Sequence, residues 1–159
     1  MEFEIVPFEM KDYKEIYQLW QSCEGIGLSD ADSPEQVQRY LERNPGCSFV
    51  AKIDGQILGA VLGGHDGRRG YLHHLAVYTS ARKMGVGSAL TEAVLRELHR
   101  EGIERVHIFV YADNKEGIAF WERIGWRLRS NLVLMSIDLQ NRFTNSVGLI
   151  NAAREQDSD

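Results

Sequence analysis

The sequence predicts a mixed α/β fold, in which a partly antiparallel sheet is flanked by about four helices. An Asp54-Gly55 pair between two apolar runs is typical of a tight hairpin that joins antiparallel strands. Elsewhere, segments with helical apolar spacing alternate with short runs of β-branched and aromatic residues. We expect a single domain over residues 1–140, since 159 residues are enough for one core, and a partly loose extension over residues 141–159.

The N-terminal part is expected to contain a strand and two helices. Residues 3–7 (FEIVP) alternate in polarity and predict the strand. A helix should follow over residues 10–22, because large apolar residues recur there at helical spacing: Tyr13, Ile16, Tyr17 and Trp20. Residues 33–36 (SPEQ) are typical of a helix start, with a capping serine, then proline, and glutamine three residues after the cap. This second helix should end near Arg43.

The middle of the chain is expected to supply the centre of the sheet and the main helix. Residues 48–64 should form the two strands of the hairpin, and residues 71–78 (YLHHLAVY) a strand apolar enough to be central. The main helix is predicted over residues 88–101, with Gly102 just past its end. Its apolar face consists of Leu90, Ala93, Val94 and Leu98.

Three further elements are predicted near the C-terminus. Residues 105–112 (RVHIFVYA) are rich in β-branched and aromatic residues and indicate a strand. Residues 114–125 indicate a short helix, and residues 131–140 (NLVLMSIDLQ) a closing strand.

The overall composition narrows the range of partners. A net charge of −5 disfavours nucleic acid as a partner. The chain has neither a run of apolar residues long enough to span a bilayer nor the start of a signal peptide, so we expect a cytoplasmic protein without membrane contact. A homodimer is compatible with these properties. Cys23 and Cys47 lack CxxC spacing and are expected to be free thiols, and no metal site is predicted.

One stretch, ARKMGVGSAL (residues 81–90), has the features of a phosphate site. It lies between a predicted central strand and the main helix, whose N-terminus would present unpaired N–H groups to an anion. Gly85 and Gly87 leave room for a phosphate near the backbone, while Arg82 and Lys83 add positive charge. The stretch matches neither a Walker loop nor the dinucleotide fingerprint. The alternative is that the glycines only allow close packing of helix on strand.

Two blocks together indicate a known family. Residues 82–87 (RKMGVG) resemble the acyl-CoA pyrophosphate loop of the GNAT superfamily of N-acetyltransferases, with its pattern Gln/Arg-x-x-Gly-x-Gly/Ala. Residues 114–126 (NKEGIAFWERIGW) resemble that family's segment Asn-x-x-Ala-x-x-Phe-Tyr-x-x-x-Gly-Phe. The resemblance covers most of residues 48–138. It implies a mostly antiparallel sheet of six to seven strands that splays at the acyl-CoA site.

The resemblance also implies that acetyl-CoA is the cosubstrate, without a metal. The pantetheine arm would run along the backbone of Leu75 and Val77, the pyrophosphate would meet the amides of residues 84–88, and Asn114 would contact the pantetheine end. The full predicted set for acetyl-CoA is Leu75, Ala76, Val77, Arg82, Lys83, Met84, Gly85, Val86, Gly87, Ser88, Asn114, Gly117, Phe120 and Trp121.

Acetyl transfer to an amine requires a base that removes the amine proton. Strict alternation along residues 71–78 would place Tyr71, His73 and Leu75 on one face and His74 on the other. The arylalkylamine acetyltransferases are similar here and carry histidines at the positions matching Tyr71 and His73. We predict His73 as the base and include Tyr71 in the site; the alternative is that the histidines only fill polar positions in the sheet.

One departure from the family concerns the acid that protonates the leaving thiolate. Many relatives use the tyrosine of Phe-Tyr, but this chain has Trp121 there, and an indole N–H is not a useful acid. CoA could leave as a thiolate, and Tyr111 is a candidate substitute acid. The rival interpretation is therefore a non-catalytic acyl-CoA-binding or sensing module on the same fold.

The acceptor is expected to be a primary amine of a small molecule, an amino acid or a protein. In this family the loop between the first two helices usually contributes to acceptor specificity. Here that loop holds three acids, Glu24, Asp30 and Asp32, which could attract an ammonium group. The alternative is that they are solvated loop acids, and that Asp32 favours the start of the next helix.

Overall fold

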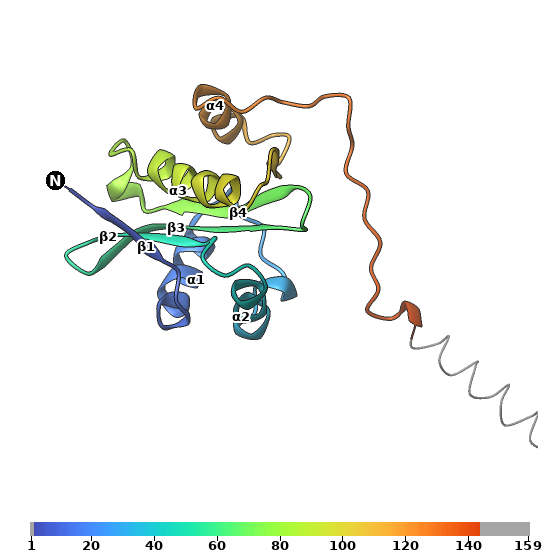
Figure 1. The fold of residues 1–159 in the computed structure, drawn as a ribbon, viewed down its shortest axis with the longest axis horizontal. Coiled ribbons are helices and arrows are strands. Elements are labelled where there is room, and N and C mark those ends of the chain that lie inside the picture. Colours follow the sequence, from blue (N-terminus) through green and yellow to red (C-terminus); the bar gives the residue numbers. More distant parts are fainter. Residues whose placement is uncertain (1, 144–159) are drawn as a thin grey trace, which may run out of the picture. The chain divides into compact units, whose positions relative to one another are not determined.

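Residues 2–143, which this computed structural model describes, contain one five-stranded sheet with helices on both faces (Figure 1). The chain divides into two compact units, Met1–Trp126 and Arg127–Asp159, and the sheet lies in the first. Its strands are β1 Glu4–Pro7, β2 Phe49–Ile53, β3 Gln56–His65, β4 Gly70–Val77 and β5 Val106–Ile108. The α-helices are α1 Tyr13–Ser22, α2 Pro34–Arg43, α3 Val86–Arg100 and α4 Lys115–Arg123. No helix within the described range is long and apolar enough to cross a membrane.

The sheet is mixed, as predicted. Its strands follow the chain order, β1 to β5, and every pair is antiparallel except the last. β4 and β5 are parallel and pair over three residues only, from Gly70 opposite Val106 to Leu72 opposite Ile108. β4 then continues to Val77 without β5 beside it, so the sheet is open between these strands from residue 73 onward.

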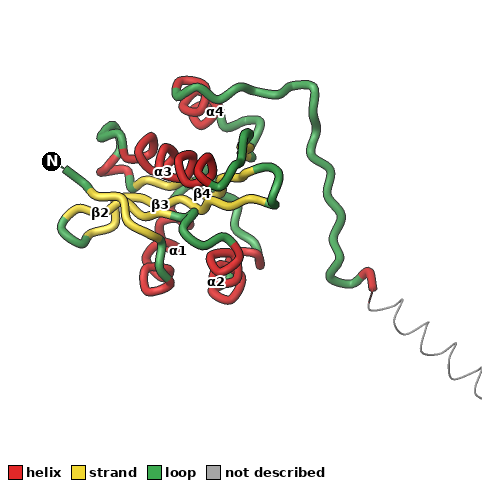
Figure 2. The backbone as a smooth tube through the Cα atoms, in the orientation of Figure 1, coloured by secondary structure: helices red, strands yellow, loops and turns green. Residues whose placement is uncertain are grey.

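Two apolar clusters hold the helices against the sheet. α1 and α2 cover one face and α3 covers the other (Figures 1 and 2). On the α1 and α2 side the buried core includes Ile16, Leu19, Trp20 and Val37. On the α3 side, Leu90, Val94 and Leu98 are fully buried against residues of β3 and β4. The helices on both sides of the sheet therefore bury the apolar faces that the sequence periodicity predicts.

Several local signals in the sequence form the expected structures. Asp54 and Gly55 both have positive φ (48° and 79°), as a tight hairpin turn requires, and join β2 to β3. The Ser33 hydroxyl accepts a hydrogen bond from the Gln36 amide at the start of α2, with Pro34 as the first helical residue. The first helix is preceded by a short 3-10 turn, Met10–Asp12, so α1 itself begins at Tyr13.

Two strand predictions are corrected by the structure. The sheet has five strands rather than six to seven, because residues 131–140 form no strand in the described part of the chain. These residues belong to the second unit, and a strand is defined only where a neighbouring strand supplies its hydrogen bonds. The strand expected over residues 105–112 is limited to Val106–Ile108, where β4 is its partner. The predicted extension lies outside the described residues from residue 144 onward.

The predicted alternation of side chains along β4 is wrong after residue 73. Leu62 of β3 is paired with His73, and Ala60 with Ala76, so β4 contains one extra residue in this interval. The extra residue is a bulge with His74 in the left-handed region, at φ 52°. Leu75 consequently packs on the α3 side, whereas His73 and His74 both lie on the α1 and α2 side.

Candidate active site

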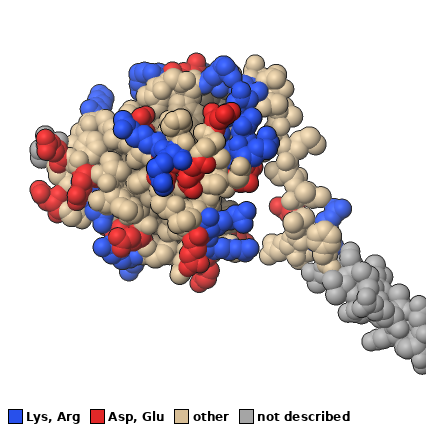
Figure 3. Space-filling view, in the orientation of Figure 1, with Lys and Arg blue, Asp and Glu red and all other residues tan. Residues whose placement is uncertain are grey.

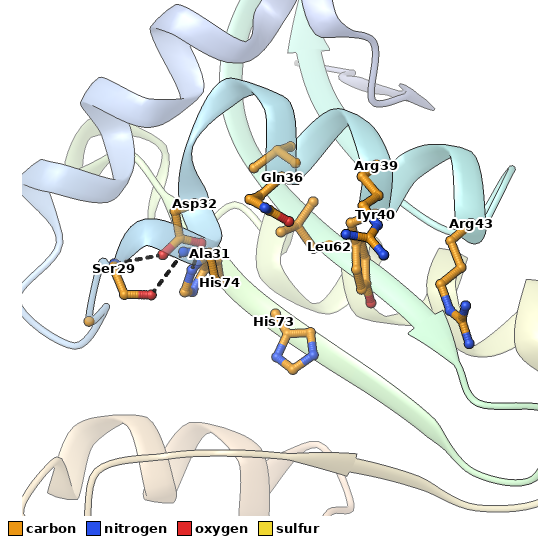
Figure 4. A pocket seen from close by; sticks show the side chains of 12 residues that line it. Ser29, Ala31, Asp32, Gln36, Arg39, Tyr40, Arg43, Leu62, His73 and His74 are labelled. Carbon is orange, nitrogen blue, oxygen red and sulfur yellow. Dashed lines mark hydrogen bonds and ion pairs between the residues drawn. The ribbon is translucent and has the colours of Figure 1, made fainter. Parts of the chain in front are cut away.

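The bulge in β4 brings two histidines into one pocket. The pocket has a volume of about 400 Å³ and lies between α2, the loop before it and β4. Gln36, Arg39, Tyr40 and Arg43 line it from α2, and His73 and His74 from β4 (Figure 4). A regular strand would have turned one of the two imidazoles away, so the left-handed residue determines the composition of this wall.

His74 is held by a buried carboxylate. Its Nε2 lies 2.7 Å from Oδ1 of Asp32, while Oδ2 of Asp32 accepts a hydrogen bond from the Ser29 amide at 3.0 Å. The imidazole also packs edge-on against Trp20, with ring centroids 4.9 Å apart. Asp32 is only 6% exposed, so both of its oxygens are bound in the interior. The pair fixes the orientation of one imidazole, as carboxylates do for functional histidines.

His73 is less constrained. Its ring packs edge-on against Tyr40 at 5.9 Å, and it makes no hydrogen bond within residues 2–143. Burial, followed by the nearby His74, lowers the pKa of His73 below the ordinary imidazole value. The residue is therefore neutral near pH 7, with a ring nitrogen that can accept a proton.

Aromatic side chains of β4 and of Phe109, the residue after β5, continue the wall beside His73. The rings of Tyr71, His73 and Phe109 are within 13° of parallel, with centroids 6.2 to 6.3 Å apart. Tyr71 thus lies beside the predicted base, as expected, although it does not line the pocket. Phe109 is 58% exposed, which leaves this row open on one side within the first unit.

The predicted pyrophosphate loop ends at the N-terminus of α3. Gly85 has φ 81° and is the residue before Val86, the first of the helix. A side-chain carbon at Gly87 would lie 3.2 Å from the Phe120 ring, so α4 packs closely over this helix end. Arg82 and Lys83 are exposed, whereas Met84 and Trp121 pack against the α3-side core. The structure therefore brings the two sequence blocks together.

The segment after β5 lies against the loop between α1 and α2. Asn114 caps α4 by accepting a hydrogen bond from the Gly117 amide, and its side chain lies close to Gly25. A side-chain carbon at Gly27 would clash with the Tyr111 hydroxyl unless the tyrosine moved. The small residues of this loop thus leave room for both predicted side chains.

The charges in the pocket differ from those predicted. Of the three loop acids, only Asp32 lines the pocket; Glu24 and Asp30 are exposed elsewhere on the loop. Arg39 and Arg43 line it instead, and neither forms an ion pair within the described residues. Their spacing of four residues on a predicted helix was a signal that sequence analysis did not use.

Sequence analysis also missed His74 as a pocket residue. Alternation gave no signal for it, because its left-handed conformation depends on the pairing of β4 with β3.

No cluster of three or more histidine, cysteine or acidic side chains suited to a metal is present in the described part of the chain. Charged side chains of both signs occur across the face shown in Figure 3.

Comparisons with known proteins agree on the family. Residues 13–126 match the family model "Acetyltransferase (GNAT) family". An acetyltransferase of Yersinia enterocolitica is 31% identical over 132 residues, covering 82% of this chain and 92% of the relative. An acetyltransferase of Sodalis glossinidius is 29% identical over 133 residues, covering 83% of this chain and 92% of the relative.

Solved structures share the fold. Ard1 from Thermoplasma volcanium superposes with a TM-score of 0.73 at 24% identity, covering 82% of this chain and 86% of the other. AAC(6')-Iy, solved with the bisubstrate analog CoA-S-monomethyl-acetylneamine, gives a TM-score of 0.71 at 17% identity, covering 87% and 100%. The chain belongs to the GNAT family of acetyltransferases.

Proposed function

We propose that the protein is an acetyl-CoA-dependent N-acetyltransferase whose acceptor amine binds in the pocket beside β4. The observation that carries this proposal is the placement of neutral His73, together with the His74–Asp32 pair, on one wall of that pocket. A binding module would have no need for a free, neutral imidazole beside the acceptor space.

The acetyl-CoA site that we propose consists of the residues predicted from the sequence. The pyrophosphate would meet the amides at the start of α3, where the helix dipole and unpaired N–H groups favour an anion. Exposed Arg82 and Lys83 flank that point. Support comes from AAC(6')-Iy, a structural neighbour solved with an analog that contains CoA.

The proposed reaction is direct attack of the amine on the thioester. His73 accepts the amine proton, directly or through a water, and the nitrogen forms a bond to the carbonyl carbon as the C–S bond breaks. CoA leaves as a thiolate, because a thiol with a pKa of about 8.5 is acidic enough to depart without help from a strong acid. Tyr111 remains the candidate donor to that sulfur. Trp121 contributes by packing against Phe120 and Trp126.

The acceptor is proposed to carry a negative group in addition to its amine. Asp32 is already engaged by His74, so the charges of the pocket that remain available are those of Arg39 and Arg43. Guanidinium groups bind carboxylates or phosphates in a bidentate manner. Amino acids and other amines with an acidic group are therefore the first acceptors to screen.

A thermal-shift titration with acetyl-CoA tests cofactor binding, since ligand at about a hundred times its dissociation constant adds roughly 2.7 kcal/mol of stability. Release of free CoA in the presence of acidic amines and their neutral analogues then tests turnover. Stabilisation with turnover supports the enzyme. Stabilisation without turnover over the whole panel would favour the acyl-CoA sensor, and the lack of any stabilisation would remove both functions.

A further inference from the structure

The pocket beside β4 contains charged side chains of both signs. Among the described residues that line it, Asp32 alone is acidic, while Arg39 and Arg43 line it from α2 (Figure 4). A free carboxylate in this space would repel the negative group of an acidic acceptor, and it would compete with that group for the guanidinium groups. The pocket can therefore favour acidic acceptors only while the carboxylate is engaged by another partner.

The Asp32 carboxylate has a partner at each of its two oxygens. Oδ1 lies 2.7 Å from Nε2 of His74, and Oδ2 accepts a hydrogen bond from the Ser29 amide. The bond from Ser29 lies within the loop before α2, so it does not connect Asp32 to the sheet. The contact with His74 is the one that draws the carboxylate toward β4, and a buried carboxylate that lost it would need a new donor.

The backbone of Asp32 is held independently of His74. Its carbonyl accepts a hydrogen bond from the Tyr13 hydroxyl of α1, and its amide donates to the Ser29 carbonyl at 3.0 Å. Loss of the imidazole would therefore release the carboxylate without moving the residue out of the pocket wall.

We propose that His74 is a positioning residue that sets the acceptor preference of the pocket by engaging the Asp32 carboxylate. The inference rests on the proposed function, which places an acidic amine in this pocket. While His74 binds Asp32, the guanidinium groups of Arg39 and Arg43 are available to the acceptor. Without His74, the carboxylate would act as a competing anion inside the pocket.

Binding of L-aspartate and L-asparagine without acetyl-CoA tests the inference, because the two amino acids differ by one side-chain charge. Calorimetry on the full-length natural protein should give a lower dissociation constant for L-aspartate. In His74→Asn this preference should fall about tenfold, since the freed carboxylate opposes the added charge. Asparagine suits the left-handed backbone at this position (φ 52°), but its side chain is too short to replace Nε2.

Neutralising Asp32 separates the effect of charge from the effect of structure. Asp32→Asn combined with His74→Asn removes the freed carboxylate and should restore the preference for L-aspartate. Asp32→Asn alone leaves the bulge untouched and should change the preference by less than about twofold, because the carboxylate is already engaged in the natural protein. A rise of about tenfold in this single variant would show a free carboxylate and overturn the inference.

Three further results would contradict the role of His74. They are equal affinities of the natural protein for the two amino acids, an unchanged preference in His74→Asn, and a loss in that variant which the double variant does not restore. Thermal unfolding with and without acetyl-CoA is the control for folding and for the cofactor site of each variant. Absence of acetyl-CoA stabilisation or of turnover would count against the proposed function, whereas the amino-acid preference reports on His74 separately.

Discussion

At the residue scale, the two adjacent histidines of β4 have different surroundings. His74 is bound to buried Asp32, whereas His73 has only ring contacts and a lowered pKa. The first is suited to hold a fixed orientation and the second to exchange a proton. Variants of the two residues should therefore have different pH dependences.

Replacing His73 with alanine should reduce the rate about a hundredfold or more, as expected for loss of a general base. In the natural protein the rate should fall only as pH drops below the ordinary imidazole range, because the lowered pKa keeps the base neutral to lower pH. The variant should lack this acidic limb. The control is His65→Ala, because His65 is the last residue of β3 and does not line the pocket. An unchanged pH–rate profile in His73→Ala would exclude His73 as the base.

The lowered pKa of His73 also has a consequence for stability. The unfolded chain binds this proton at about pH 6.5 and the folded protein only at lower pH, so stability is present above pH 6.5 and falls as pH decreases below it. The slope from this residue is at most about 1.4 kcal/mol per pH unit. Denaturant unfolding at several pH values should show a weaker acid dependence in His73→Gln. Identical dependences in both proteins would contradict the assigned shift.

The two cysteines should differ in reactivity. Cys47 is fully buried, and burial, assisted by its hydrogen bond to Glu101, raises the pKa of its thiol to about 12. Cys23 is half-buried. A thiol reagent at mildly alkaline pH should label Cys23 first, with Cys47 labelled only on unfolding. Mass spectrometry of the native protein would reveal an early label on Cys47, which would disprove this order.

At the scale of elements, the signals that sequence analysis predicted well are local ones. The Asp54-Gly55 turn, the Ser33 cap and the apolar face of α3 depend on residues close in the chain, and all three occur in the structure. The His74 bulge depends instead on pairing between β3 and β4, so periodicity alone gave the wrong faces. The same is true of residues 131–140, where a strand needs a partner that the sequence pattern does not name.

The cap of α2 can be tested directly, because this helix carries Arg39 and Tyr40 into the pocket. Ser33→Ala removes the acceptor of the Gln36 amide and should cost about 1 kcal/mol of folding free energy. Chemical denaturation measures the difference. Ser80→Ala, at an exposed serine without a side-chain hydrogen bond in the described residues, should be neutral. Equal costs for the two variants would show that the cap does not stabilise α2.

At the scale of the whole molecule, the sequence predicted the family. The blocks at residues 82–87 and 114–126 match the residue patterns of the GNAT family. Each pattern is confined to one loop or helix, so it can be found without the structure, and the family model agrees. If acetyl-CoA binds the whole folded domain as proposed, the midpoint of thermal unfolding should rise with acetyl-CoA concentration. A midpoint that stays constant over a wide range of acetyl-CoA concentration would contradict the proposed site.

The left-handed residue in β4 has a consequence for how the site is prepared for reaction. Because one strand carries both imidazoles toward the same pocket, their relative positions are set by a single stretch of backbone inside the sheet. The entropy of arranging them is then lost once, during folding, and not again in each catalytic cycle. Catalysis in this protein would therefore depend on the rigidity of its sheet more than on the closing of a loop.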